Sequence, residues 1–282
     1  MSKERIFLWV IGVVLMGGVT IISIQAMLSK PYDGIAAVAF AAADYDEALA
    51  LWTVEADQGD ANAHIQIGMM YEQGIGVLED LALAAKHFHF AAELGDAVGQ
   101  TRLAIMYEGG LGVKRNARTA ADWLALAAEQ GHLEAQTRLA AIYGAGPLHM
   151  RRPDLALLWY ETAGERGDLK SQVNAGIIHR SGPRGVERNP EAAAKWFRMA
   201  AEQGSSSAQY SLGLLLENRT APTKSNIEAY AWFRVAMAQG NSRARGRVTA
   251  LENRLSPEDL VVAKAMSKEF WDTFAAPFRT DD

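Results

Sequence analysis

The stretch Asp96–Gly131, DAVGQTRLAIMYEGGLGVKRNARTAADWLALAAEQG, decides the fold because recognisable copies of it lie before and after it in the chain. A glycine closes each copy, and successive closing glycines are 36, 36, 36, 37 and 36 residues apart. These glycines are Gly59, Gly95, Gly131, Gly167, Gly204 and Gly240. Self-similarity at a fixed period of roughly 20–50 residues indicates a repeat protein.

Two further positions stay in phase with the closing glycines. Eleven residues before each glycine stands an alanine: Ala48, Ala84, Ala120, Ala156, Ala193 and Ala229. Seven or eight residues before each glycine stands at least one aromatic side chain, a tryptophan in five of the six copies. Three kinds of residue that keep one period together indicate a repeated structural unit and not a chance effect of an alanine-rich composition.

Each unit is predicted to be a pair of helices. Eight, nine and twelve residues after the glycine come a large apolar residue, a small residue and usually a tyrosine, such as Leu103, Ala104 and Tyr107, which is helical spacing. A left-handed glycine commonly ends a helix. The residue after the glycine then opens the next helix, and five of these six residues are good N-caps: Asp60, Asp96, Asp168, Ser205 and Asn241. Glycine-rich loops join the first helix (A) to the second (B).

These motifs resemble the Sel-one-like repeat (SLR), a relative of the tetratricopeptide repeat. The resemblance rests on A-x-x-x-x-L-G-x-x-Y-x-x-G-x-G-V followed by A-x-x-W-F/Y-x-x-A-A-x-x-G, is clearest in residues 61–96 and 97–132, and covers residues 60–255. GAGPLHMRRP lacks the second loop glycine, ENRTAPTKSN has lost the glycine loop, and the fourth unit has one inserted residue. The resemblance implies an all-α fold, a right-handed α-solenoid of antiparallel helix pairs.

The expected domain organisation follows from these boundaries. Five repeats occupy residues 60–95, 96–131, 132–167, 168–204 and 205–240, after a linker and N-terminal capping helix pair at 28–59. Residues 241–282 are expected to form C-terminal capping helices and a tail. Ser256 followed by Pro257 predicts the start of the last helix, which should end near Phe274. The aromatic residues of this helix are predicted to pack on the fifth repeat, with a docking surface as the alternative.

The N-terminus is predicted to associate with a membrane. After the charged residues 1–5, Ile6–Ile24 is a run of nineteen uncharged, mostly aliphatic residues, which spans ~28 Å as a helix and could cross a bilayer. We expect residues 6–27 to be a transmembrane anchor, with a cleaved signal as the alternative and a buried helix as the third possibility. Lys3 and Arg5 precede the run and Lys30 alone follows it, which predicts a cytoplasmic n-region at 1–5. The repeats of an inner-membrane, single-pass protein would then face the periplasm, or the protein would be periplasmic if the signal is cleaved.

Charge and composition narrow the classes of partner. The formal net charge is −5 at pH 7, which disfavours general nucleic-acid binding. No cysteine is present, so thiol chemistry is excluded. The early repeats are acidic, whereas basic residues gather later: Arg151, Arg152, Arg166, Lys170, Arg180, Arg184 and Arg188. This gradient either orients a partner or is a solvated face.

No catalytic or metal-binding motif emerges. His87 and His89 are two residues apart on a predicted helix and point about 200° away from each other, so no metal site is expected there, and His87 is predicted to be a packed, hydrogen-bonded ring. The loop from Gly74 to Gly76 lacks the context of a phosphate-binding loop. Neither S-x-x-K nor K-T-G occurs. A Ser–His–Asp set assembled across space stays open, but we expect neither an enzyme nor a cofactor.

The resemblance also implies a binding groove. In tetratricopeptide-type folds the A helices line the concave side, and positions six, ten and thirteen after each glycine should face it. These are Ile65, Met69, Glu72, Thr101, Ile105, Glu108, Thr137, Ala141, Gly144, Val173, Ile177, Arg180, Tyr210, Leu214 and Glu217. An apolar centre with a charged edge is typical of a protein interface, although inter-repeat packing is the competing interpretation.

The expected function is therefore a non-enzymatic scaffold that holds a protein or peptide partner in this groove, on the outer face of the membrane. The resemblance implies roles in assembling or regulating envelope complexes. The alternative is a cell-wall or polysaccharide-binding module of the periplasm. Its groove should display tryptophan and tyrosine platforms, whereas the tryptophans here are predicted to occupy core positions.

Overall fold

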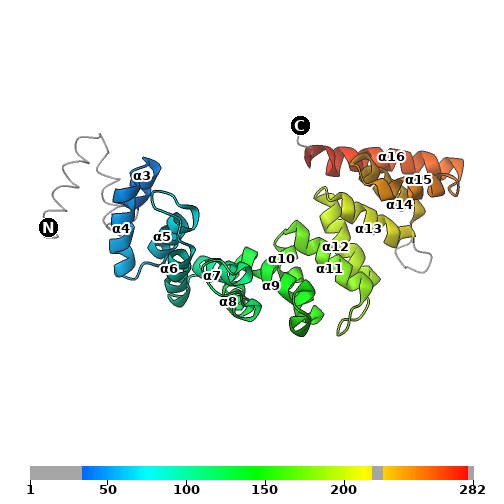
Figure 1. Cartoon of the computed structure of the whole chain (residues 1–282). Helices are drawn as coiled ribbons and strands as arrows, with labels where there is room; N and C mark the ends of the chain where they lie inside the picture. Colours follow the sequence, from blue (N-terminus) through cyan, green and yellow to red (C-terminus); the bar gives the residue numbers. More distant parts are fainter. Residues whose placement is uncertain (1–33, 218–224, 279–282) are drawn as a thin grey trace. The chain divides into compact units, whose positions relative to one another are not determined.

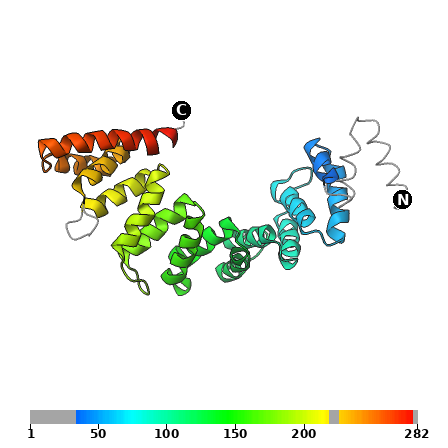
Figure 2. The same ribbon diagram turned by 180° about the vertical axis from the view of Figure 1, so that it is seen from behind.

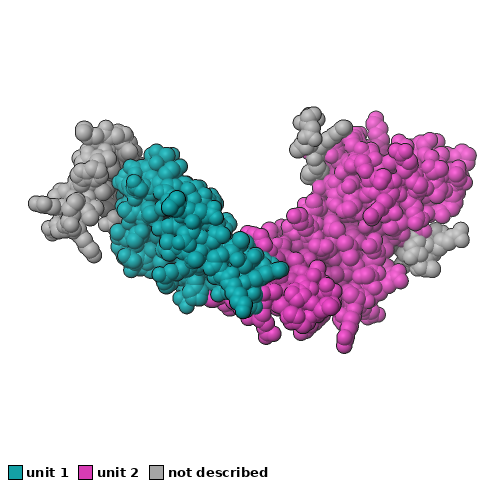
Figure 3. Space-filling model, viewed as in Figure 1, with its two compact units in different colours: residues 1–116 teal, residues 117–282 magenta. Residues whose placement is uncertain are grey.

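The computed structural model describes residues 34–217 and 225–278, and within these ranges the regular structure is entirely helical. The chain forms two compact units, residues 1–116 and 117–282 (Figure 3). Residues 6–27, the expected membrane anchor, lie outside the described residues. Among the helices that the structure does describe, none is both long enough and apolar enough to span a bilayer.

The described part of unit 1, residues 34–116, contains five helices, each packed on the next one along the chain (Figures 1 and 2). They are α3 (Ile35–Ala41), α4 (Tyr45–Asp57), α5 (Ala61–Gln73), α6 (Leu81–Glu93) and α7 (Ala97–Gly109). α5 and α7 are A helices, and α4 and α6 are B helices. The short α3 packs on α4, and its buried small residues belong to the hydrophobic core that α4 and α5 also form.

Unit 2 continues the same alternation of A and B helices. Its helices are α8 (Ala117–Glu129), α9 (Leu133–Ala145), α10 (Pro153–Glu165), α11 (Leu169–Ser181), α12 (Pro190–Glu202), α13 (Ser206–Glu217), α14 (Asn226–Ala238), α15 (Ser242–Glu252) and α16 (Pro257–Phe274). Short 3₁₀ turns lie at Leu148–Met150 and Ala276–Phe278. Every helix from α8 to α15 packs on its neighbour in sequence, and α16 lies along α14.

The helix ends use the caps that the sequence predicts, with one exception. All six closing glycines are followed by a new helix, and all six have φ between 84° and 92°. The carboxylate of Asp96 accepts hydrogen bonds from the backbone of Val98 and Gly99 at 2.7 and 2.9 Å, and Asp60, Asp168 and Ser205 act similarly. The exception is Asn241, whose side chain does not cap α15 but donates to the carbonyl of Ser206 at 3.1 Å.

Small residues on the A helices allow the B helices to approach closely. A Cβ atom added to Gly68 of α5 would lie 2.7 Å from the ring of Phe88 on α6, and one added to Gly176 of α11 would lie 2.7 Å from the ring of Phe197 on α12. Both rings are fully buried. A glycine or alanine stands nine residues after each of the first five closing glycines. Where it is glycine, it is a packing requirement, because a larger side chain would overlap an aromatic ring that cannot move into solvent.

The aromatic C-terminal helix packs on the last repeat. The ring of Phe270 lies 4.4 Å, centroid to centroid, from the indole of Trp232 on α14, and the ring of Phe274 lies 5.7 Å from it. Trp232 is fully buried. Ser256 caps α16 by accepting from the backbone N–H of Asp259, with Pro257 in the first turn. These two phenylalanines thus close the end of unit 2, which agrees with the packing interpretation of the sequence.

Candidate partner-binding surface

The outward face of each A helix is formed by positions three, seven, ten and fourteen after the closing glycine. These positions are exposed or half-buried on every A helix from α5 to α13 wherever the structure describes them. We call this set of residues the A-helix surface. In unit 1 it comprises Asn62, Gln66, Met69, Gln73, Val98, Arg102, Ile105 and Gly109. In unit 2 it comprises Glu134, Arg138, Ala141, Ala145, Lys170, Asn174, Ile177, Ser181, Ser207, Ser211 and Leu214.

Position ten gives the A-helix surface its apolar character. All five helices carry an apolar side chain there, and each is half-buried or exposed: Met69, Ile105, Ala141, Ile177 and Leu214. The side chain of Ile177 is 39% exposed. The neighbouring positions three and seven are mostly polar. The predicted position-ten residues therefore reach the surface, where a partner could contact them.

Position six lies deeper than the sequence interpretation assumed. Ile65 is only 5% exposed and Thr101 only 1% exposed, so these two side chains do not face a groove. The hydroxyl of Thr101 donates to the carbonyl of Ala97 in its own helix at 2.7 Å. Thr137 is half-buried, and Val173 and Tyr210 are half-buried against the core of unit 2. Position six is thus mainly a packing position.

Position thirteen carries charges that are largely used within the protein. Glu72 on α5 lies 3.8 Å from Arg102 on α7, and Arg180 lies over the ring of Phe197 at 5.5 Å. Glu217 accepts from two arginines of the C-terminal region, at 3.3 Å from Arg247 and 3.1 Å from Arg254. Glu108 is half-buried and Gly144 is exposed. The expected charged edge of the groove is therefore partly neutralised by neighbouring helices.

On each A helix, the observed exposed face is rotated about the helix axis relative to the face that the sequence predicts. At ~100° per residue, positions six, ten and thirteen centre about 60° away from positions three, seven, ten and fourteen. Position ten belongs to both sets. Positions six and thirteen lie on the side that turns towards neighbouring helices, whereas positions three and seven, such as Gln66 and Arg102, were missed.

A buried glutamine joins neighbouring repeats and was also missed. Five residues after the closing glycine stand Gln100, Gln136, Gln172 and Gln209, all of which are buried. In each case the amide donates to a carbonyl near the end of the preceding B helix, for example from Gln172 to Gly164 at 2.9 Å. Gln172 also accepts from Gln203 at 2.8 Å, and Gln209 accepts from Gln239 at 3.0 Å. The recurrence of glutamine at one phase of the repeat was the signal that could have revealed this bridge.

The first repeat replaces that glutamine with a histidine. Nδ1 of His64 on α5 lies 3.2 Å from Nδ1 of His87 on α6, so one ring donates and the other accepts. Burial, together with His64 and Lys86, lowers the pKa of His87 from 6.5 to about 4. Burial also lowers the pKa of His64, although Asp57 and Asp60 oppose this effect. His87 is a packed, hydrogen-bonded ring, as predicted. His89 instead pairs with Glu93 at 3.2 Å.

A second histidine contact lies in the fourth repeat. Oε1 of Glu161 on α10 accepts from Nε2 of His179 at 2.8 Å and from the indole N–H of Trp196 at 3.2 Å. His179 occupies the position that is tyrosine in the first three repeats. The carboxylate of Glu161 thus joins three consecutive helices and has a structural role. Across residues 34–217 and 225–278, no set of three or more His, Cys, Asp or Glu side chains is arranged to hold a metal ion.

The two units differ in charge. Residues 1–116 contain 14 acidic and 7 basic side chains, whereas residues 117–282 contain 19 acidic and 21 basic ones. The acidic character is strongest in residues 34–85, which contain nine acidic side chains and no lysine or arginine. The A-helix surface of unit 1 therefore lies in a negative environment, which favours basic groups on a partner.

The matches to known proteins coincide with the repeats of this chain. The family model described as Sel1 repeat matches residues 61–96, 97–132, 133–168, 169–205 and 206–241. The crystal structure of a Sel1 repeat protein from Oxalobacter formigenes is similar with a TM-score of 0.65 and 27% identity, and the match covers 83% of this chain and 98% of that one.

Two further solved structures are similar at lower scores. One is c5321, a protective antigen of uropathogenic Escherichia coli strains that displays an SLR fold, with 23% identity, a TM-score of 0.37, and coverage of 83% of this chain and 67% of that one. The other is the immunity protein Pa5087 from Pseudomonas aeruginosa, with 18% identity, a TM-score of 0.35, and coverage of 70% and 75%. No curated protein matches the sequence.

Proposed function

Because the chain belongs to the Sel1 repeat family, whose members are generally protein-interaction scaffolds, we propose that it is a non-enzymatic adaptor that binds a protein or peptide on its A-helix surface. The bound segment would lie across position ten of successive A helices within one unit. Its apolar side chains would contact Met69 and Ile105 in unit 1, or Ile177 and Leu214 in unit 2. The polar residues at positions three and seven would form the edges of the contact.

The row of apolar residues at position ten is the observation that supports this proposal. Isolated apolar side chains on a surface are common and need no explanation. Here, however, the same position is apolar on all five A helices and is at least partly accessible on each. A spacing set by the repeat suits an extended or helical partner that makes one contact with each repeat.

A protein partner is favoured over a polysaccharide. Carbohydrate-binding surfaces need exposed aromatic platforms, and none of the described residues of the A-helix surface is a tryptophan or tyrosine. Trp52, Trp196 and Trp232 are buried. The periplasmic polysaccharide-binding alternative therefore has no structural observation in its favour.

We further propose that residues 6–27 attach the protein to the inner membrane and that the repeats face the periplasm. The long uncharged run and the basic residues before it support this location. A protease-accessibility assay on spheroplasts tests it. Digestion of the repeats by protease added outside the inner membrane is expected, and protection of the repeats in intact spheroplasts would contradict the proposal.

The binding proposal is tested by changing the row of apolar residues. The double variant Ile105→Glu/Ile177→Glu places charges on the A-helix surface of each unit. We expect it to keep its far-UV circular dichroism and melting temperature while its recovery of the partner from detergent-solubilised membranes falls at least about tenfold, since a desolvated charge in an apolar contact costs more than ~1.4 kcal/mol.

A matched control is Leu158→Glu/Val261→Glu. These apolar side chains are 53% and 69% exposed, lie on α10 and α16, and are outside the A-helix surface. The control should capture the same protein as the unaltered chain. Equal recovery by the Ile105/Ile177 variant would contradict binding on the A-helix surface, and failure of the unaltered chain to retain any protein would contradict the proposed protein partner.

A further inference from the structure

The helix α15 of unit 2 presents arginines that the fold does not use. One side of α15 packs into the core of unit 2 against α14. Its first turn carries Arg243 and Arg245, both exposed, and no acidic residue. Neither guanidinium group has a hydrogen bond or an ion pair with a described residue, whereas Arg247 pairs with Glu217. The backbone N–H groups at the start of a helix disfavour a positive charge, so these two arginines are locally unfavourable.

The helix α4 of unit 1 carries the opposite arrangement. Asp57, its last residue, is exposed at the end where the helix dipole disfavours a negative charge. Within the described ranges its carboxylate forms no hydrogen bond or ion pair, and its only recorded effect is to oppose the lowering of the His64 pKa by burial. Residues 34–85 contain no lysine or arginine to neutralise it. The fold therefore keeps a charge without an ion-pair partner at the unfavourable end of each of these two helices.

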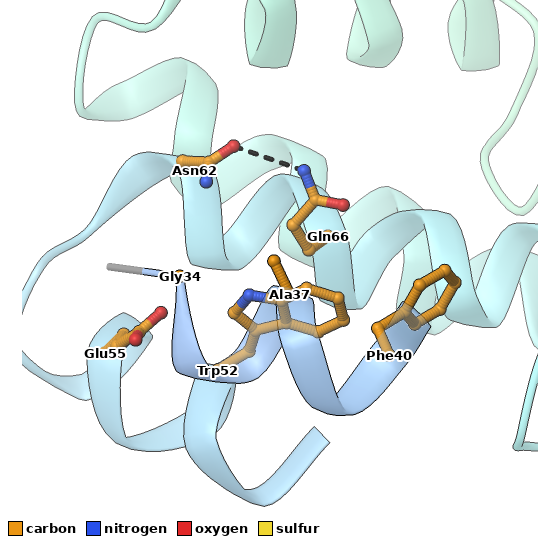
Figure 4. A pocket seen from close by; sticks show the side chains of 7 residues that line it. All are labelled: Gly34, Ala37, Phe40, Trp52, Glu55, Asn62 and Gln66. Atoms are coloured by element: carbon orange, nitrogen blue, oxygen red, sulfur yellow. Dashed lines mark hydrogen bonds between the residues drawn. The ribbon is translucent and has the colours of Figure 1, made fainter. Parts of the chain in front are cut away.

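The packing of unit 1 uses a different side of α4. Trp52 lines a cavity of about 160 Å³ that α4 shares with α3 and α5 (Figure 4). The exposed residues Asp46, Ala50, Thr53 and Asp57 are four, three and four residues apart, which places them together on another side of the helix. We call these four residues the α4 face. Its carboxylates lie at the two ends and its middle is small, so a second helix can approach it closely.

The exposed side of α15 has a matching spacing. Arg243, Arg247 and Ala250 are four and three residues apart and exposed, and we call them the α15 face. In an antiparallel pair of helices with Arg243 opposite Asp57, Ala250 lies opposite Ala50, because each alanine is seven residues from its charge. The guanidinium group then lies at the negative end of α4, and the carboxylate lies at the positive end of α15. One contact thus relieves both unfavourable charges.

We infer that the α15 face of one copy of this chain binds the α4 face of a second copy. A second copy is favoured over an unrelated acidic protein because the same chain supplies a face of matching spacing and opposite charge. Since the two faces differ, the contact is heterologous, and each copy in a pair keeps one face for another copy. A contact between two short helices buries less than the ~1,200–2,000 Å² of a stable complex, so the association should be weak and sensitive to salt.

The first test measures the self-association of the full-length chain in a mild non-ionic detergent by sedimentation velocity. The mass of protein per particle should rise above the 30.7 kDa of one chain as the concentration increases. We expect a dissociation constant of ~10–100 μM. Raising NaCl from ~0.1 M to ~1 M should weaken the association at least about tenfold, because the Debye length falls from ~10 Å to ~3 Å. A mass of one chain at every concentration would overturn the inference.

Two charge reversals test the residues that pair. Arg243→Glu and Asp57→Arg should each weaken self-association at least about tenfold, because each brings like charges together. When the two variants are mixed, they should associate with each other within about threefold of the unaltered chain, since the charges on the two faces are again opposite. A mixture that stays dissociated would show that these two faces do not bind each other.

The stability of the same variants separates binding from folding. Each reversal introduces the sign of charge that its helix end favours, so the melting temperature should stay the same or rise. A marked fall would assign these charges to the fold and contradict the inference. The matched controls are Lys264→Glu on α16 and Glu79→Arg in the acidic stretch, which reverse one exposed charge each and should alter self-association less than about twofold. Equal effects of controls and test variants would reduce the association to net charge and also contradict it.

Introduced cysteines show which copies are joined, because the chain has no cysteine of its own. A copy with Ala50→Cys and a copy with Ala250→Cys should form an intermolecular disulfide on mild oxidation, which requires Cβ atoms within ~4.5 Å. Replacing the first copy by one with Leu158→Cys, exposed on α10, should prevent it. A disulfide within one diluted chain that carries both cysteines would place the two faces together in a single copy and overturn the inference. The Ile105→Glu/Ile177→Glu variant should self-associate normally, so failure of the adaptor proposal is distinguishable.

Discussion

The first repeat and the later repeats carry different polar side chains at the same position of the A helix, five residues after the closing glycine. In the fourth repeat Gln172 bridges two B helices, because its amide donates to Gly164 and its carbonyl accepts from Gln203. At the same position in the first repeat His64 contacts His87, which stands where four later repeats carry a tryptophan. Both versions place a polar contact at this point, but only the histidine version can titrate, and burial lowers the pKa of both rings below 6.5.

The first repeat also differs from the later repeats in its charge and in the cavity that borders it. The first repeat lies in the stretch without lysine or arginine, and it borders the cavity among α3, α4 and α5. In unit 2 the equivalent helices are covered by further repeats, and the indole N–H groups of Trp196 and Trp232 find carboxylates within the stack. The end of a repeat array is therefore chemically different from its interior even where the sequence pattern is the same.

The largest effect is expected when the glutamine bridge is broken. Gln172→Leu keeps much of the volume but removes two hydrogen bonds: the donor that Gln172 supplies to the carbonyl of Gly164, which keeps only the backbone N–H of Gly167, and the acceptor of Gln203. We expect a loss of about 3 kcal/mol in the free energy of unfolding, measured by urea denaturation. The loss should be nearly the same at pH 7 and pH 5, because no titrating group is involved.

The control for this change is Gln203→Ala, which removes the Gln172–Gln203 bond but leaves the donor to Gly164 in place. It should cost less than about 1 kcal/mol. A similar cost for both variants would show that the buried carbonyl is not the important group.

A smaller effect is expected at the close contact that both regions share. Gly176→Ala and Gly68→Ala each place a Cβ atom 2.7 Å from a fully buried phenylalanine ring. Each substitution should lower the unfolding free energy by about 2 kcal/mol. Hydrogen exchange followed by mass spectrometry should locate the loosened amides around α11 and α12 in the first case and around α5 and α6 in the second.

Gly144→Ala is the matched control for these two variants. It lies on the A helix α9, but its added Cβ would be 3.6 Å from the nearest atom, the Cβ of Ala156, which is an ordinary contact. Higher helix propensity should then make it neutral or stabilising by up to about 1 kcal/mol. Destabilisation by Gly144→Ala comparable to that of Gly176→Ala would contradict the steric explanation.

The smallest effect is expected on acidification, and it should be confined to the first repeat. The pKa of His87 is about 4 in the folded protein and 6.5 ordinarily, so below pH 6.5 the unfolded chain binds a proton that the folded chain does not. Stability conferred by the neutral ring is complete above pH 6.5, falls as the pH approaches 4, and levels off below it. Allowing for solvent screening, the loss at pH 5 should be about 1 kcal/mol.

His64→Gln/His87→Trp tests this assignment by giving the first repeat the residues of the second, Gln100 and Trp123. The difference in unfolding free energy between this variant and the unaltered chain should grow between pH 7 and pH 5, since other titrating groups are common to both. Hydrogen exchange in α5 and α6 should become less dependent on pH in the variant. An unchanged pH dependence would show that other groups are responsible.

The sequence by itself determined the repeat, its phase and most of its helix ends. The glycine period, the in-phase alanines and aromatics, and the caps at Asp96 and Ser256 act through local backbone and side-chain bonding, and the same local pattern occurs repeatedly. Helix ends depend mainly on such nearby groups. The small residue at position nine was also interpretable, because a glycine such as Gly176 in a helix suggests a close approach by a neighbour.

Only the tertiary structure decided which way each A helix faces and where open space remains. Ile65 and Thr101 are buried because neighbouring helices contact that side, and a shift of about 60° around the helix axis cannot be resolved from a pattern in which most positions are apolar or small. Gln172 looks like a surface residue in the sequence, yet it is buried because a carbonyl from the preceding repeat is within reach. The cavity beside Trp52 arises from three helices that meet at the end of the array, a property that no single repeat contains.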